Sequence, residues 1–294
     1  MGIIDEKDLE AVSPLFRGET GHHFAGFLMH LFSFDRVNQL YDNSSQYTGA
    51  AFAANILKDL KVNYVVGNAG RLRQLPEGAF ITISNHPYGG LDGVIMIDMM
   101  ASIRKDYKFM VNRILSMVKA MNDNFISVTP TGNKKAKITA ASINGVRQTL
   151  KWLQEGHPVG FFPSGAVSDF SLLTLKVRDR RWQPGILHLI CQAKVPILPI
   201  RFFDGNSAFF YSLGLINWRV RILRQPSEIF NKAGKKHRLA IGNLISVEEQ
   251  KQFSDFTSLG AFLRKAVYEM PLPSSFTPRE DLFFMDGVSA RQPG

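Results

Sequence analysis

Cysteine is almost absent from this sequence, which has only Cys191 among its 294 residues. A single cysteine excludes a disulfide within the chain and disfavours a structural zinc site, which usually needs several thiolates. Cys191 lies in an apolar segment that predicts a buried helix. We therefore expect its thiol to be a small core side chain rather than a reactive group.

Long apolar runs are also missing. No stretch reaches the about 18 uninterrupted apolar residues that a membrane-spanning helix needs, so no such helix is expected. The first ten residues, MGIIDEKDLE, are acidic and too polar for a signal peptide, and Glu6 stands where a myristoylation signal needs Ser or Thr. We therefore expect a peripheral protein at the cytoplasmic face of the (inner) membrane.

Acidic residues are outnumbered: 25 Asp and Glu face 35 Lys and Arg, giving a formal net charge of +10. Such an excess implies an anionic partner, which can be a membrane surface, an acidic carrier protein or nucleic acid. No helix-turn-helix spacing, zinc pattern or aromatic RNA-binding signature supports nucleic acid. An anionic membrane surface or an acidic carrier is the better expectation.

A short loop stands out against this background. Residues 79–84 are rich in Ile, Phe and Thr and predict a buried strand, after which Pro87, Gly89 and Gly90 forbid regular structure. Asp92 then opens an apolar run, where it can cap a helix or turn back toward His86. The loop can thus present an imidazole and a carboxylate together.

That pair has a clear chemical use. An alcohol that attacks an acyl carbonyl must lose a proton, and a neutral imidazole is the usual base for this step. A carboxylate at the other ring nitrogen would fix the tautomer and stabilise the imidazolium. The alternative is a loop histidine beside an aspartate that only caps a helix.

The remaining pattern predicts an α/β fold with a largely parallel mixed sheet flanked by helices. Residues 1–60 are expected to form an N-terminal helical, membrane-associating extension, and residues 61–294 an α/β domain with a C-terminal strap. Within the extension, segment 24–34 is either an interfacial helix or a core helix. Ser44 or Ser45 is expected to cap the next helix. The strands predicted after it are 62–66, 108–111, 125–128, 159–162, 195–202, 219–223 and 238–241. The predicted helices are 137–155, 184–193 and 259–269.

Three blocks in order resemble the glycerolipid acyltransferase (PlsC-like) superfamily. Asn85-His86 and Asp92 resemble its first motif, although five residues rather than the family's four separate His86 from Asp92. FFPSGAVSD at 161–169 resembles the Phe-Pro-Glu-Gly block, and VPILPIRF at 195–202 resembles the Val-Pro-hydrophobic-Pro block. The resemblance covers roughly residues 60 to 225 and implies an O-acyltransferase that uses no metal and no cofactor, with His86 as base and Asp92 as its partner.

Other residues near these blocks are further candidates for the site. Backbone N–H groups of Gly165, or of Gly89 and Gly90, are candidates to stabilise the tetrahedral oxyanion. Asn85, Ser164 and Ser168 are candidates for substrate binding. Lys176, Arg178, Arg180 and Arg181 form a basic cluster that either binds a carboxylate or phosphate or is simply a solvated face.

Two departures from the family pattern concern the acceptor. Ser164 and Val167 replace a glutamate and an arginine of the third block, and ISVTP at 126–130 has no arginine where the second motif has one. A phosphate-bearing acceptor is therefore in doubt. The chain looks most like the bacterial aminolipid branch, whose acceptors are lyso-ornithine or lyso-glycine lipids.

The sequence thus predicts transfer of an acyl group from an acyl carrier protein or acyl-CoA thioester to the hydroxyl of a lysolipid. A lyso-aminolipid is the first expectation and 1-acylglycerol 3-phosphate the second. A hydrolase with Ser164, His86 and Asp92 as a triad is a rival, although no Gly-x-Ser-x-Gly elbow is present. A nonenzymatic basic membrane- or nucleic-acid-binding protein is the third class.

Overall fold

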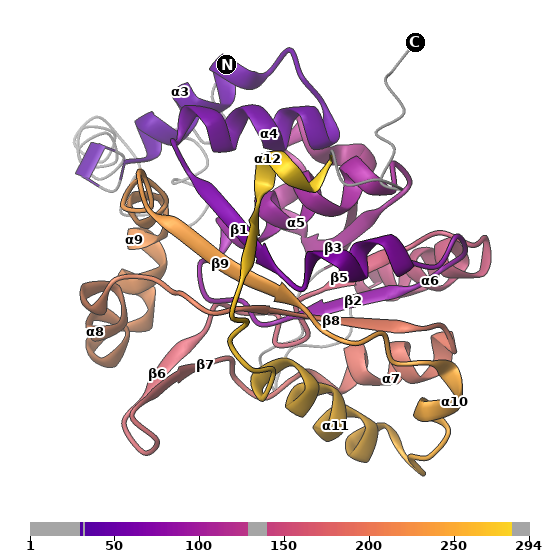
Figure 1. Cartoon of the computed structure of the whole chain (residues 1–294). Coiled ribbons are helices and arrows are strands. Elements are labelled where there is room, and N and C mark those ends of the chain that lie inside the picture. Colours follow the sequence, from indigo (N-terminus) through magenta and orange to yellow (C-terminus); the bar gives the residue numbers. More distant parts are fainter. Residues whose placement is uncertain (1–29, 32, 129–139, 284–294) are drawn as a thin grey trace.

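The computed structural model describes residues 30, 31, 33–128 and 140–283. An eight-stranded sheet runs through its centre with helices on both faces (Figure 1). Its strands, in spatial order, are β10 (Phe276–Pro278), β1 (Asn63–Gly67), β9 (Lys236–Ile241), β8 (Ile197–Phe202), β2 (Ile81–Ser84), β5 (Val159–Phe161), β3 (Lys108–Asn112) and β4 (Phe125–Val128). Neighbours are parallel except for the β1–β10 and β8–β9 pairs, so the predicted mixed, largely parallel sheet is confirmed.

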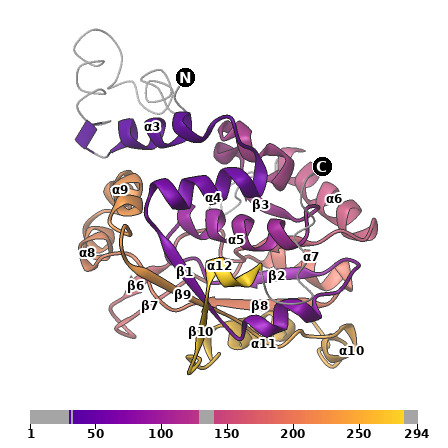
Figure 2. The same ribbon diagram turned by 45° about the horizontal axis from the view of Figure 1, so that its top comes forward.

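Helices cover the sheet on both sides (Figures 1 and 2). The longer ones are α3 (Phe34–Ser44), α4 (Gly49–Asp59), α5 (Gly90–Ile103), α6 (Ala140–Gln154), α7 (Pro184–Ala193), α8 (Ala208–Ile216), α9 (Trp218–Phe230) and α11 (Phe256–Tyr268). The short elements are α10 (Val247–Gln250), α12 (Arg279–Leu282) and the 3-10 turns η2 (Ala69–Gln74), η3 (Arg113–Met117) and η4 (Lys119–Asn124). A separate hairpin pairs β6 (Asp169–Ser171) with β7 (Lys176–Arg178).

Two cores form because side chains alternate across each strand. Ile81 and Ile83 of β2 enter the core beneath α7 and α11, whereas Leu198 and Ile200 of β8 enter the core shared with α4 and α5. The apolar side chains of α4 and of the residue that follows it are buried in the core shared with α4 and α5, namely Phe52, Ala53, Ile56, Leu57 and Leu60. Residues 52–60 thus pack with the α/β body, and a domain boundary at residue 60 stays a prediction.

Most predicted elements are confirmed within two or three residues, but three expectations are wrong. Residues 219–223 form a helix, not a strand, because Arg221, Gln225 and Glu228 of α9 lie at helical spacing and bond toward the body. Ser44 ends α3 and Thr48 precedes α4, so neither Ser44 nor Ser45 caps that helix. Cys191 is exposed, because it lies on the outer side of α7.

Some expectations fall on residues that are not described. These are most of segment 24–34, the start of the predicted helix at 137, residues 129–130 of ISVTP and the tail after 283. In the described part of the chain, no helix is both long and apolar enough to cross a membrane.

Candidate active site

The carboxyl ends of parallel strands meet at one edge of the sheet, and the predicted catalytic loop follows one of them. Asn85 and His86 come directly after β2, and Phe162 directly after the neighbouring β5. The buried Asn85 amide donates to the Phe202 carbonyl and accepts from the Phe202 N–H, each at 2.8 Å. Asn85 therefore fixes the loop to the end of β8 rather than facing a substrate.

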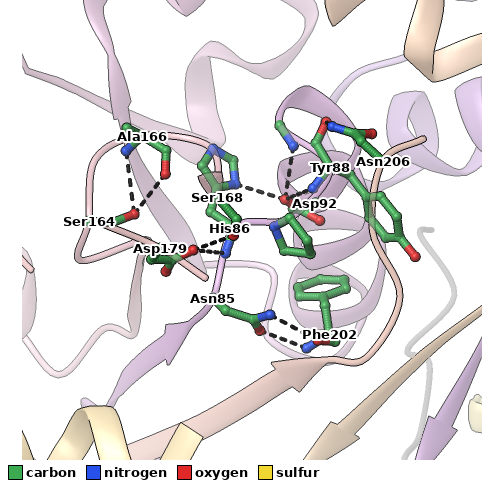
Figure 3. Close-up of polar contacts among 12 residues, drawn as sticks. Asn85, His86, Tyr88, Asp92, Ser164, Ala166, Ser168, Asp179, Phe202 and Asn206 are labelled. Atoms are coloured by element: carbon green, nitrogen blue, oxygen red, sulfur yellow. Dashed lines mark hydrogen bonds and ion pairs between the residues drawn. The ribbon is translucent and has the colours of Figure 1, made fainter. Parts of the chain in front are cut away.

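His86 and Asp92 are brought together as predicted (Figure 3). The distance from His86 Nδ1 to Asp92 Oδ2 is 2.8 Å, and Asp92 is fully buried. The same Oδ2 accepts the N–H groups of Tyr88, at 2.9 Å, and Gly89, at 3.0 Å. An ionised carboxylate can only accept, so Nδ1 carries the proton and Nε2 keeps its lone pair.

Gly89 makes this turn possible. Its φ of 85° is a left-handed conformation that disfavours other residues, and a Cβ there would lie 2.1 Å from Gln225 Nε2 of α9. The chain therefore folds back on itself and begins α5 at Gly90, with Asp92 in the first turn. The additional residue of this loop is accommodated without separating His86 from Asp92.

The imidazole is held on its face and through its backbone as well. Its ring stacks on Phe162, with centroids 3.9 Å apart. The His86 N–H donates to Asp179 Oδ1 at 3.1 Å, and Ser168 donates its N–H to the His86 carbonyl at 2.9 Å and its hydroxyl to Asp179 at 2.6 Å (Figure 3). The ring cannot turn without breaking several contacts, so Nε2 keeps one direction.

Burial raises the pKa of Asp92, although its hydrogen bonds to His86 and to the two amides act in the opposite direction. Within the described residues its second oxygen, Oδ1, has no hydrogen-bond partner. The carboxylate is thus less well solvated than in water. The buried carboxylate is therefore stabilised most when His86 becomes positively charged. His86 acquires that charge when it acts as a general base and accepts a proton.

His86 lines a cavity of about 610 Å³. Most of its lining is apolar and comes from α3, α4, β3, η4, α6 and α9, including Leu40, Phe52, Val111, Met121, Val146 and Ile229. Of the Lys, Arg, Asp and Glu residues that the structure describes, only Arg147 on α6 lines it. The cavity can hold a long apolar chain with its reactive end at His86.

The hydrogen-bond partners of the candidate oxyanion donors show which of their N–H groups are already bonded within the protein. The Gly89 N–H is bonded to Asp92, and the Gly165 N–H donates to the Phe162 carbonyl at 2.9 Å. Gly90, which lines the cavity, is the first residue of α5, where N–H groups have no partner within the helix. Among the predicted glycines, the Gly90 N–H at this helix N-terminus is the best-placed donor for a developing negative charge.

The other predicted residues have different positions. The Ser164 hydroxyl donates to the Ala166 carbonyl at 2.8 Å, and no bond joins it to His86, so a Ser–His–Asp triad is not formed among these residues (Figure 3). Lys176 and Arg178 are exposed on β7 and do not line the cavity. Arg180 pairs with Asp169, and Arg181 is exposed.

Three residues that contribute to this site were not predicted. Phe162 belongs to a motif, but its stacking on the imidazole was not foreseen. Asp179 is the one acidic residue in the basic run 176–181. An isolated carboxylate in such a run indicated a hydrogen-bond partner elsewhere in the chain, and that partner is the His86 N–H. Arg147 follows Val146 on α6, and both residues line the cavity. No group of three His, Cys, Asp or Glu among the described residues could hold a metal ion.

Comparisons with known proteins agree on one family. A family model described as Acyltransferase matches residues 25–273. A lyso-glycine lipid O-acyltransferase of Bacteroides thetaiotaomicron is 23% identical over 243 residues, which cover 80% of this chain and 85% of that protein. The enzyme of the same name from Phocaeicola vulgatus is 22% identical over 252 residues, with 83% and 86% covered.

A solved structure is also similar. The 1-acyl-sn-glycerophosphate (LPA) acyltransferase PlsC from Thermotoga maritima aligns with a TM-score of 0.47 at 15% identity, over 84% of this chain and 86% of that one.

Proposed function

This chain belongs to the Acyltransferase family and is an acyltransferase, and from that premise we propose that it acylates the hydroxyl of a lyso-aminolipid with a thioester donor. The observation that carries the proposal is that His86, paired with Asp92, lines a largely apolar cavity of about 610 Å³. The two curated relatives are named for a lyso-glycine lipid acceptor, which supports the same acceptor class here.

The chemistry needs one base and no covalent enzyme intermediate. His86 Nε2 takes the proton of the acceptor hydroxyl as its oxygen attacks the thioester carbonyl. The tetrahedral oxyanion lies toward the N-terminus of α5, where the Gly90 N–H and the helix dipole stabilise it. When the carbon–sulfur bond breaks, the imidazolium returns the proton to the departing thiolate, and Asp92 holds Nδ1 throughout.

The charges around the cavity bear on the acceptor. A phosphate monoester carries nearly two negative charges near neutral pH, and burying it requires several charge-assisted partners. Val167, in the position of the family arginine, lines the cavity, and Arg147 is the one cation that the described residues place there. One arginine suits one carboxylate, which is what an N-acyl amino acid lipid presents.

We expect the enzyme to prefer a lyso-aminolipid over lysophosphatidic acid by at least about tenfold in kcat/KM. This needs only about 1.4 kcal/mol of differential transition-state stabilisation. Both acceptors are offered in one reaction with the same acyl donor, and both products are quantified by mass spectrometry. A preference for lysophosphatidic acid would favour 1-acylglycerol-3-phosphate acyltransferase activity and remove the aminolipid assignment, while leaving the base mechanism in place.

Replacing Arg147 by glutamine is expected to lower kcat/KM for the lyso-aminolipid by about tenfold or more, mainly through KM, because a hydrogen bond to a charged group contributes about 1.5–3 kcal/mol. The methyl ester of the same lipid lacks the carboxylate and should react equally with the wild type and the variant.

Lys151 provides a matched control for this test. It lies one turn further along α6 and is exposed and outside the cavity lining, so Lys151→Gln should leave both acceptors unaffected. Equal losses with the acid and the ester would show that Arg147 acts on the donor or on the fold, not on the acceptor carboxylate.

The donor and the site of action belong to the proposal too. The net charge of +10 suits an acidic acyl carrier protein or the phosphates of acyl-CoA, and rates with each donor at matched acyl chains will distinguish them. We propose that the enzyme works on the cytoplasmic face of the membrane as a peripheral protein, because its acceptor resides in lipid.

A further inference from the structure

Leucines at the tip of the β6–β7 hairpin are exposed to an unusual extent. Residues 172–175 connect the two strands and read Leu-Leu-Thr-Leu, where polar turn residues are normal. Leu173 is 98% exposed, and Leu172 and Leu175 are exposed as well. Phe170 pairs with Val177 across the hairpin, so apolar side chains continue from the tip along one of its faces.

One of these leucines, Leu175, has a backbone conformation that is unfavourable for leucine. Leu175 has a φ of 51°, a left-handed conformation in which glycine or asparagine is the usual choice. A bulky side chain there is strained, and local folding gives no reason for it. Outliers of this kind are found at binding sites, where the side chain itself is needed.

A second apolar group lies beside the hairpin. α8 packs against β6, and the turn from α8 to α9 exposes Leu215, Ile216 and Trp218, with Ile216 83% exposed. Both views show the hairpin and this turn projecting from the same side of the molecule (Figures 1 and 2). We name the side chains of 172–175 and 215–218 together the hairpin–corner surface.

The charge around this surface has one sign. Residues 170–178 contain Lys176 and Arg178 and no acidic residue, and residues 207–226 contain no acidic residue either. Lys176 and Arg178 are exposed and point away from the apolar face of the hairpin, as strand alternation requires. The surface therefore combines apolar side chains, an interfacial tryptophan and basic residues, which together fit an anionic lipid surface.

We propose that the hairpin–corner surface docks on an anionic bilayer, with Leu172, Leu173 and Leu175 entering the boundary between head groups and acyl chains. Lys176 and Arg178 then contact lipid phosphates rather than an acceptor in the cavity. The proposal rests on the proposed function only in taking lipid as the partner.

Docking here is mechanically linked to the active site. Asp169, at the base of the hairpin, pairs with the buried Arg221 of α9. Next to it, Ser168 donates its N–H to His86, and Asp179 at the other base accepts the His86 N–H. The hairpin is thus fixed to the loop that carries the base, so lipid that holds the tip also fixes the position of His86 relative to the membrane.

Flotation of the full chain with phosphatidylcholine vesicles, with and without phosphatidylglycerol, tests the proposal. The double variant Leu172→Gln/Leu173→Gln should lower partitioning by at least about tenfold, because it removes two apolar side chains whose transfer out of water favours binding. Leu272→Gln is the matched control, because Leu272 is 54% exposed but lies outside the surface. It should float like the wild type.

Two further variants separate the apolar and the charged contributions. Leu175→Gly should weaken binding while leaving the melting temperature unchanged or higher, since glycine relieves the left-handed strain. Lys176→Gln/Arg178→Gln should weaken binding only to vesicles that contain phosphatidylglycerol, and in about 0.1 M salt more than in 1 M salt. Lys151→Gln/Lys251→Gln, which changes the net charge equally, should have little effect.

Activity on a lysolipid dispersed in detergent should be the same for the wild type and for Leu172→Gln/Leu173→Gln. This assay therefore distinguishes a loss of membrane binding from a loss of the proposed acyltransferase activity. Unchanged flotation of this double variant, or an equal loss with Leu272→Gln, would overturn the proposal. So would a wild type that does not float but forms a dimer that Leu173→Gln dissociates, because the surface would then bind a second copy of the chain.

Discussion

Replacing His86 by alanine is expected to lower kcat for acyl transfer by about 10²- to 10⁴-fold, because no other titratable base among the described residues lines the cavity beside it to accept the proton of the attacking hydroxyl. The effect should appear in kcat more than in the KM for either substrate, since Nε2 acts on the transition state. Initial rates with a purified acyl donor and a detergent-dispersed lyso-aminolipid measure it.

His86→Gln is the matched variant. Its amide can still donate toward Asp92, so the buried carboxylate keeps a partner, yet an amide is not a base. We expect the glutamine variant to melt closer to the wild type than the alanine variant does, while both are comparably inactive. Wild-type turnover by either variant would remove His86 from the mechanism and with it the proposed assignment of base.

Replacing Asp92 by asparagine is the second large expected effect, a loss of about 10²-fold or more in kcat that stays smaller than the loss in His86→Ala. The asparagine oxygen can still accept the N–H groups of Tyr88 and Gly89, so the loop should keep its turn. In the wild type His86 Nδ1 bonds the same carboxylate oxygen as these two N–H groups, so the asparagine oxygen also accepts the Nδ1 proton and the histidine keeps its tautomer. Activity is lost because the positive charge of the imidazolium no longer has a negative partner.

The stability of Asp92→Asn should depend on pH differently from that of the wild type. Because burial raises the pKa of Asp92, the folded protein binds more protons than the unfolded chain between the unfolded and folded pKa values. Wild-type stability contributed by this group is therefore greatest below the unfolded pKa and declines as pH rises through the folded pKa. Asparagine does not titrate, so the variant should gain in free energy of unfolding relative to the wild type as the pH rises above the unfolded pKa of about 3.9.

Denaturant unfolding of both proteins across that pH range checks the sign. A difference that does not change with pH would mean that the Asp92 carboxylate is as well solvated in the fold as in the unfolded chain. Full activity of Asp92→Asn would mean that Asp92 only caps α5, which is the alternative reading of its sequence position.

Sequence by itself determined the parts that depend on neighbouring residues. The apolar run before Asn85 predicted β2, the glycines predicted its sharp exit, and six residues were few enough for Asp92 to fold back onto His86. The alternation of strands and helices predicted a largely parallel sheet, because each element buries a face that its own periodicity reveals. The strand predicted at residues 219–223 is wrong because contacts of α9 with distant residues, such as the Arg221 bond to Ser168 and the Gln225 bond to Tyr88, favour a helix there.

Only the tertiary structure decided which distant residues meet. Asp179 lies 93 residues beyond His86, yet it accepts the His86 backbone N–H. Arg147 reaches the cavity from α6. Lys176 and Arg178 belong to the basic run that follows the third motif, but they lie on a hairpin strand outside the cavity. Local sequence records the chemical type of these side chains but not their direction. That direction follows from the packing of α6 and α9 and of the hairpin against the sheet, which is a sum of contacts between residues far apart in the chain, and no spacing along the chain encodes it.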